Sequence, residues 1–174
     1  MLDVLKHLCQ TLEDTGIPYM LSGSMALNVY TIPRMTMDID VVLGITAASA
    51  EGFISALEND FFVDDEVIQA EVRRQGMFNL VHKKTAVRID CIVQKHTPFR
   101  QAEMERRQYL DMGGFSAYVA SIEDLILSKL IWIQDLQSEK QMEDLRQLLA
   151  SRRADLAYIR HWVERLHLKT FDLL

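Results

Sequence analysis

The sequence predicts an α+β fold, in which a mixed sheet is flanked by helices and followed by a C-terminal helical bundle. Two features indicate this: short apolar runs alternate with helical stripes early in the chain, and the later part reads as helix throughout. Apolar residues form 49% of the 174 residues, which is enough for the core of one domain. We expect an α/β body over residues 1–120 and a helical region over 121–174 packed on it.

The first predicted element is an amphipathic helix. Leu5, Leu8 and Leu12 recur at helical spacing, so they fall on one face. Gly16 and Pro18 end this helix, because glycine favours the left-handed C-terminal position and proline cannot continue the hydrogen bonding.

Two strands and two helices follow. Residues 19–22 are predicted to form a short buried strand, and residues 25–30 favour a helix that Pro33 must end. Residues 38–43 alternate acidic and apolar side chains and then stay apolar, as a strand does when one end carries a site. The next helix has an apolar stripe that ends at Leu57, with a threonine as its cap.

The rest of the body contains hairpins and the last segment contains helices. Residues 78–82 and 87–93 read as strands joined by a polar turn, and a further hairpin is predicted around Gly113-Gly114, giving four or five strands in all. Three helices are then predicted, the first opened by a capping box at Ser121. They span 121 to about 135, 141–150 and 155–166.

Composition excludes several classes of function. The net charge of −6 argues against a protein that coats nucleic acid, which usually has a basic excess. No run of about 18 uncharged apolar residues is present, so we expect no membrane span. The N-terminus does not resemble a secretory signal, and Cys9 and Cys91 read as buried free thiols, so we expect a cytoplasmic protein.

A strand that turns into a helix at residues 21–24 is the first candidate site. Gly23 allows a tight turn and a close approach to a ligand. Ser24 offers a hydroxyl and a backbone N–H near a helix N-terminus, where anions are favoured. Taken alone, Gly-Ser before a helix is more often a simple cap.

The second candidate is the pair Asp38 and Asp40. Positions two apart in a strand share a face, so the two carboxylates project together while Ile39 enters the core. Such carboxylates repel unless a cation lies between them, and a hard cation such as Mg²⁺ fits oxygen ligands. A solvated strand edge is the alternative.

The third candidate is Asp90, which lies in an otherwise apolar strand. An unpaired carboxylate there costs free energy or shifts its pKa. It completes a trio of carboxylates able to hold two metal ions. The alternative is a buried aspartate paired with Arg88 or Arg34.

These three motifs together resemble the DNA polymerase β-like nucleotidyltransferase superfamily over the first hundred residues. Its members read Gly-Gly or Gly-Ser at a strand–helix turn, Asp-x-Asp in the next strand and a third carboxylate later, here Gly23-Ser24, Asp38/Asp40 and Asp90. The sequences of residues 22–26 and 34–42 resemble those of a bacterial branch that includes abortive-infection nucleotidyltransferase toxins.

The resemblance implies a nucleotidyltransferase-like fold and a reaction. An acceptor oxygen attacks the α-phosphorus of a nucleoside triphosphate such as ATP, and pyrophosphate leaves. Two Mg²⁺ (or Mn²⁺) ions would be bound by Asp38, Asp40 and Asp90. Gly23 and Ser24 would cradle the outer phosphates.

Three further residues are implied to contact the nucleotide. Arg34 and Lys129 would neutralise developing charge, and Thr36 would orient the strand or touch phosphate. Lys129 lies in an apolar helix similar to the family's Asp-Leu…Lys-Leu helix, where it meets an anion or snorkels to water. Asp144 reads instead as a solvated helix residue or the partner of an arginine.

The acceptor does not follow from the sequence: a small molecule, a protein or a tRNA all remain open. Two alternatives also stay open: a toxin–antitoxin component acting through a protein partner, and a degenerate regulator that binds nucleotide without catalysis. The last helices carry apolar residues, among them Trp132 and Met142, that suit either the core or a homodimer face.

Overall fold

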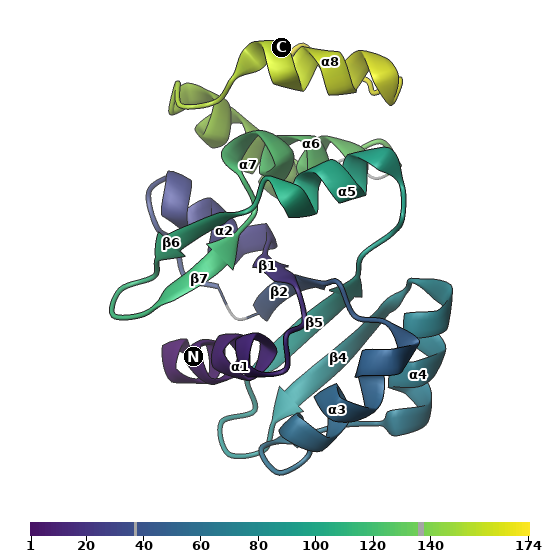
Figure 1. The fold of residues 1–174 in the computed structure, drawn as a ribbon. Coiled ribbons are helices and arrows are strands. Elements are labelled where there is room, and N and C mark those ends of the chain that lie inside the picture. Colours follow the sequence, from purple (N-terminus) through teal and green to yellow (C-terminus); the bar gives the residue numbers. More distant parts are fainter. Residues whose placement is uncertain (37, 136–137) are drawn as a thin grey trace.

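A mixed sheet of seven strands runs through the computed structural model, which describes residues 1–36, 38–135 and 138–174. Across the sheet the strand order is β3-β4-β5-β2-β1-β7-β6 (Figure 1). The predicted α+β fold with a mixed sheet is confirmed, but the expected four or five strands were too few. The strands are β1 (Tyr19–Leu21), β2 (Asp38–Leu43), β3 (Phe61–Phe62), β4 (Met77–His82), β5 (Arg88–Val93), β6 (Gln108–Asp111) and β7 (Ser116–Val119).

Eight helices accompany this sheet in the described residues. They are α1 (Leu2–Asp14), α2 (Gly23–Tyr30), α3 (Ala47–Leu57), α4 (Asp65–Arg74), α5 (Pro98–Glu105), α6 (Ile122–Trp132), α7 (Glu139–Ala150) and α8 (Leu156–Arg165). Figure 1 shows α3 and α4 at one end of the molecule and α5 to α8 stacked at the other. Helix α2 contacts both α6 and α7, so it links the sheet to the C-terminal helices.

The predicted elements agree closely with those observed. Leu5, Leu8 and Leu12 of α1 are fully buried, as their spacing requires. The cap of α3 is Thr46, whose backbone N–H donates to the Ser49 hydroxyl at 3.0 Å. Such patterns predict helices well because both the apolar spacing and the capping bond involve residues that are close in sequence.

Three elements were not predicted. Strand β3 has only two residues, too few to show a period. Helix α4 is mostly polar, yet its Asp64 side chain caps it by accepting from the Val67 N–H at 3.1 Å. Helix α5 begins at Pro98, a residue that suits the first turn of a helix because its missing N–H is not needed there.

The N-terminus of α6 is fixed by buried polar contacts. The Ser121 hydroxyl accepts from the Asp124 backbone N–H at 3.2 Å, so the predicted cap is confirmed. The Asp124 side chain is fully buried and accepts from Arg106 Nε at 3.1 Å and the Tyr158 hydroxyl at 2.8 Å. Because a buried carboxylate needs such partners, these bonds fasten α6 to the end of α5 and to α8.

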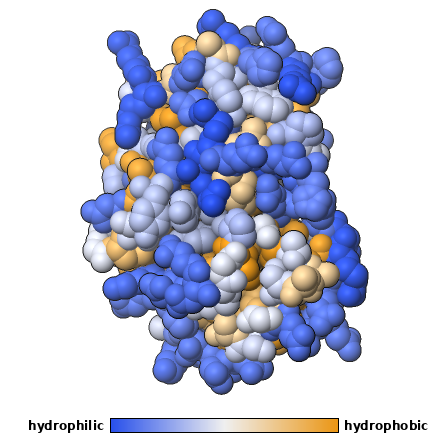
Figure 2. All heavy atoms as spheres, viewed as in Figure 1, coloured by the Kyte–Doolittle hydropathy of each residue, from blue (hydrophilic) through white to orange (hydrophobic). Residues whose placement is uncertain are grey.

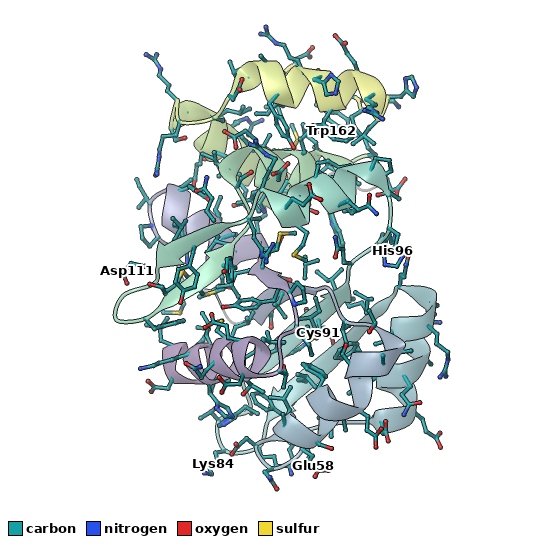
Figure 3. The ribbon with its side chains drawn as sticks, in the orientation of Figure 1. Glu58, Lys84, Cys91, His96, Asp111 and Trp162 are labelled. Carbon is teal, nitrogen blue, oxygen red and sulfur yellow. The ribbon has the colours of Figure 1, made fainter. Side chains whose placement is uncertain are left out.

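The C-terminal helices bury one face and expose another. Trp162 of α8 packs edge-on against Phe99 of α5, with ring centroids 5.2 Å apart (Figure 3). Trp132, in contrast, is 66% exposed, so its predicted place in the core was wrong, and a dimer face stays a prediction. The division of the chain at residue 120 also stays a prediction.

The face of the molecule shown in Figure 2 is largely polar. Figure 2 shows hydrophilic residues over most of one face, with apolar residues in scattered groups. None of the described helices is long and apolar enough to cross a membrane.

Candidate active site

Two carboxylates lie side by side because β2 and β5 pair in parallel. In their register Asp40 stands opposite Asp90, and Asp38 opposite Arg88. The apolar neighbours Ile39 and Ile89 are fully buried, so the strand alternation turns the acidic side chains to the other face. Asp40 and Asp90 are half-buried and Asp38 is exposed.

Gly23 makes room for the Asp40 carboxylate. Its φ of +54° lies in the left-handed region, and a Cβ there would stand 1.9 Å from Oδ2 of Asp40. The Ser22 backbone N–H donates to the Asp40 carbonyl oxygen at 2.9 Å, which fastens the turn to β2. Any side chain at Gly23 would therefore displace the carboxylate or strain the turn.

The carboxylates repel one another electrostatically. Burial raises the pKa of Asp40 most, and the charge of Asp90 raises it next, with a smaller contribution from Asp38. The Ser24 backbone N–H and the charge of Lys129 act the other way and lower that pKa. Asp40 thus lies in a negative field that a cation would relieve.

Asp90 has a partner in this structure. Arg88 Nε donates to Asp90 Oδ1 at 2.7 Å, and the Arg88 side chain is 49% exposed. Of the two partners considered from the sequence, Arg88 is right and Arg34 is wrong. Because Arg88 lies at the surface, the pair contributes little to stability and is readily exchanged for another cation.

The donor chemistry of the three carboxylates fits a hard divalent cation. All are oxygen ligands, and Asp40 stands opposite Asp90 across the strand pair, next to the turn at Gly23. Within the described residues, no three His, Cys, Asp or Glu side chains are already clustered as a metal site. Asp38 would have to turn in from solvent, and Asp90 would have to leave Arg88.

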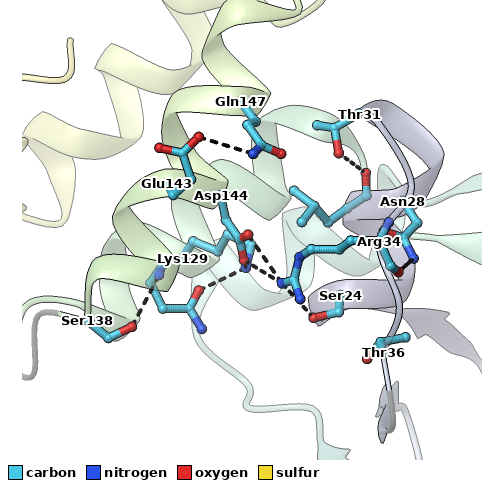
Figure 4. Close-up of polar contacts among 12 residues, drawn as sticks. Ser24, Asn28, Thr31, Arg34, Thr36, Lys129, Ser138, Glu143, Asp144 and Gln147 are labelled. Atoms are coloured by element: carbon cyan, nitrogen blue, oxygen red, sulfur yellow. Dashed lines mark hydrogen bonds and ion pairs between the residues drawn. The ribbon is translucent and has the colours of Figure 1, made fainter.

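A cluster of charges lies next to this face, shown in Figure 4. Arg34 Nη2 donates to the Ser24 hydroxyl at 3.0 Å and to Asp144 Oδ2 at 3.1 Å. Lys129 Nζ donates to the same carboxylate at 2.8 Å, and to Gln141 Oε1 at 2.8 Å. The structure therefore brings together three of the residues implied to contact phosphate, Ser24, Arg34 and Lys129.

Of the two interpretations of Asp144 offered by the sequence, one is wrong and one is right. Its solvated interpretation fails because it is 3% exposed, while its interpretation as the partner of an arginine is confirmed. Lys129 does not snorkel to water, since it is 7% exposed and paired with Asp144. No sequence pattern marks Asp144 as buried, because its burial depends on how α7 packs against α2 and α6.

Asn28 is a second residue that the sequence did not reveal. Its side chain donates to the Arg34 carbonyl at 2.8 Å and accepts from the Arg34 N–H at 3.0 Å. These two bonds fix the backbone that carries Arg34, whose Nε is buried without a hydrogen-bond partner in the described residues. No sequence pattern marks such a contact six residues apart.

Thr36 is bonded to the strand that carries Asp38. Its hydroxyl donates to the Asp38 carbonyl oxygen at 3.2 Å, and the residue is half-buried. The contact fits the predicted role of orienting the strand that carries Asp38. A role in touching phosphate stays a prediction.

Comparison with protein families decides the identity of the chain. The family described as nucleotidyl transferase AbiEii toxin, Type IV TA system, matches residues 6–172. The chain belongs to this family. It is a nucleotidyltransferase, and the resemblance inferred from Gly23-Ser24 and the aspartates is confirmed at the level of the family. Comparison with curated proteins gave no match.

Solved structures share the fold of this AbiEii-family chain. An antigenic nucleotidyltransferase-like protein from Paracoccidioides brasiliensis is 20% identical, with a TM-score of 0.56 over 86% of this chain and 73% of that one. The lincosamide antibiotic adenylyltransferase LnuA is 16% identical, with a TM-score of 0.56 over 84% and 95%. ANT(2")-Ia in complex with adenylyl-2"-tobramycin is 12% identical, with a TM-score of 0.58 over 91% of each chain.

Proposed function

We propose that this nucleotidyltransferase depends on two divalent cations, Mg²⁺ or Mn²⁺, held by Asp38, Asp40 and Asp90. The observation that carries the proposal is the register of β2 and β5, which sets Asp40 opposite Asp90 beside the turn at Gly23. When bound, such ions stabilise the charge that develops on the attacking and leaving oxygens. Two neighbouring carboxylates are suited to binding these ions, because a cation relieves their mutual repulsion.

Asp90 has a second task in this proposal. It orients the acceptor oxygen and accepts its proton while Arg88, now unpaired, turns into solvent. Arg88 is half-exposed, so its release costs little. Asp40 stays fixed because its backbone is bonded to Ser22, and its carboxyl group is bonded to the backbone N–H of Ser24.

The triphosphate lies against the start of α2. The backbone N–H groups after Gly23 and the Ser24 hydroxyl bind phosphate oxygens at a helix N-terminus. Arg34 and Lys129 neutralise the charge of the leaving pyrophosphate. Both now pair with Asp144, which holds them in place and shares them with the phosphates.

The position of the label distinguishes this reaction from phosphoryl transfer. The chain is incubated with Mg²⁺, a cell extract and a nucleoside triphosphate labelled at either the α- or the γ-phosphorus. We expect the α-label to reach an acceptor and the γ-label to leave as pyrophosphate. Transfer of the γ-label to the acceptor, or transfer of the α-label that persists in chelator, would contradict the proposal.

The same extract identifies the acceptor. Separation of labelled small molecules, proteins and tRNA decides among the three classes, and testing each base in turn decides the nucleotide. The description of the family as a toxin favours a cellular macromolecule whose loss of function stops growth. If instead no acceptor is labelled but a protein partner is captured, the alternative of a toxin–antitoxin component acting through that partner holds.

A further inference from the structure

A surface cavity lies apart from the carboxylates. It has a volume of about 320 Å³ and lies between the end of α1 and the hairpin of β6 and β7. Tyr19 lines it from the first residue of β1, whereas Gly23 follows the other end of that strand. The cavity and the candidate active site are therefore at opposite ends of β1.

Aromatic rings form the walls of the cavity. Tyr109 is 54% exposed, and its ring centroid lies 4.8 Å from that of Tyr118. Tyr118 in turn meets Tyr19 edge-on at 5.6 Å. An exposed ring supported by the half-buried Tyr118 and, behind it, the buried Tyr19 is a platform on which a planar ligand stacks.

Opposite charges line the same cavity without neutralising each other. Glu13 is exposed, and its Oε1 accepts from the Tyr19 hydroxyl at 2.8 Å, while Oε2 forms no hydrogen bond within the described residues. Arg107 lies with its guanidinium carbon 4.6 Å from the Tyr118 ring centroid, and Nη1 donates to the Met104 carbonyl at 2.6 Å. Glu13 and Arg107 both line the cavity, and within the described residues each is bonded to a group other than its opposite charge.

A ligand that suits these walls is planar, with hydrogen-bond donors on one edge and acceptors on another. Guanine has this pattern: N1–H and the 2-amino group donate, as a carboxylate requires, while O6 and N7 accept, as a guanidinium requires. Adenine has no adjacent pair of donors. A phosphate is disfavoured here because Glu13 would repel it.

We infer that this cavity binds the base of a guanosine, which stacks on Tyr109 and hydrogen-bonds to Glu13 and Arg107. The ribose and any phosphate face solvent. The base belongs either to a free nucleoside or nucleotide, or to an unpaired guanosine in an RNA strand. In both cases the ligand is additional to the nucleoside triphosphate of the proposed reaction.

Binding of guanosine by the intact chain, measured by calorimetry, tests this site. Inosine lacks the 2-amino group and 7-deazaguanosine lacks N7, so each should bind about tenfold more weakly through one lost bond to a charged group. Glu13→Gln and Tyr109→Leu should weaken guanosine binding about tenfold or more, and Tyr109→Phe should restore it. Glu51→Gln, which changes an exposed glutamate on α3, is the matched control.

Two comparisons decide the outcome. Guanosine should bind equally well when the catalytic site is saturated with a nucleoside triphosphate and Mg²⁺, and the transfer reaction of Tyr109→Leu should remain normal in the absence of guanosine. A single-stranded RNA that binds more tightly than guanosine assigns the base to RNA, and equal affinity assigns it to a free nucleotide. Equal binding of adenosine and guanosine, displacement by the triphosphate, or undiminished binding by Glu13→Gln would overturn the inference.

Discussion

Asp40 and Asp90 are neighbours because two strands pair in parallel, whereas Arg34, Lys129 and Asp144 meet because separate segments dock. The carboxylates carry excess negative charge, and burial with mutual repulsion raises the pKa of Asp40. In the second group, two cations share the buried carboxylate of Asp144. One region therefore carries repelling negative charges, which a cation relieves in the proposed reaction, while the other pairs its own opposite charges.

The largest expected effect is a loss of transfer activity when a carboxylate of β2 is changed. Asp40→Asn removes one cation ligand, so nucleotidyl transfer should fall by several kcal/mol in the transition state, about a thousandfold or more. The fold should be retained in chelator, since asparagine still accepts a bond through its amide oxygen. Initial rates and melting curves measure the two effects. Asp3→Asn, in the first turn of α1, is the control, and normal rates in Asp40→Asn would contradict the assignment.

A change in the group of Arg34, Lys129 and Asp144 should lower the free energy of unfolding. Asp144→Ala leaves Lys129 buried and unpaired beside Arg34, which should cost about 3–5 kcal/mol in the free energy of unfolding. Denaturant titration measures this cost. Glu143→Ala removes an exposed neighbouring carboxylate and should change stability by less than about 0.5 kcal/mol. Equal effects of the two changes would show that Asp144 is not a buried partner.

Replacing the whole charged group separates stability from function. Arg34→Met, Lys129→Met and Asp144→Leu combined remove all three charges and leave no unpaired ion. Such replacements are often neutral or stabilising by about 1–4 kcal/mol, so this variant should be at least as stable as the wild type and yet inactive. Unfolding titrations and the α-label assay check both halves of the expectation. A triple variant as unstable as Asp144→Ala would mean that the charges themselves hold α6 and α7 in place.

The smallest effect concerns pH. Because the pKa of Asp40 is raised above its ordinary value of 3.8, folded chains keep a proton that unfolded chains lose. This contribution to stability is complete below pH 3.8 and is lost as the pH rises through the raised pKa. In chelator, the melting temperature of Asp40→Asn minus that of the wild type should therefore increase from acid to neutral pH. A decrease of this quantity over the same interval would refute the raised pKa.

The contrast between the strand-paired carboxylates and the docked charges explains which site residues the sequence could predict. Asp38, Asp40 and Asp90 follow from strand alternation and a motif, because a period of two places residues on one face whatever the rest of the fold does. The cap at Asp64 and the proline that opens α5 are visible in the sequence, but both helices are predominantly polar, and neither was predicted.

Contacts between residues far apart in the chain could not be predicted from the sequence. The ion pair of Arg34 with Asp144 joins residues far apart in the chain, and it exists only because α7 docks beside α2. The contact of Arg88 with Asp90 is different, since the two residues are two apart in β5 and the sequence already offered Arg88 as a partner. Burial decided the role of Asp144, and burial is a property of the assembled fold.

Binding of Mn²⁺ in the presence of a nucleoside triphosphate tests the central claim most directly, because the ion can be counted by electron paramagnetic resonance. The account predicts two ions per wild-type chain, and a loss of this binding when Asp38, Asp40 and Asp90 are all changed to asparagine. The triple change to Arg34→Met, Lys129→Met and Asp144→Leu should leave the carboxylate ligands in place. Unchanged Mn²⁺ binding by the asparagine variant would contradict the claim that these strands form a cation site.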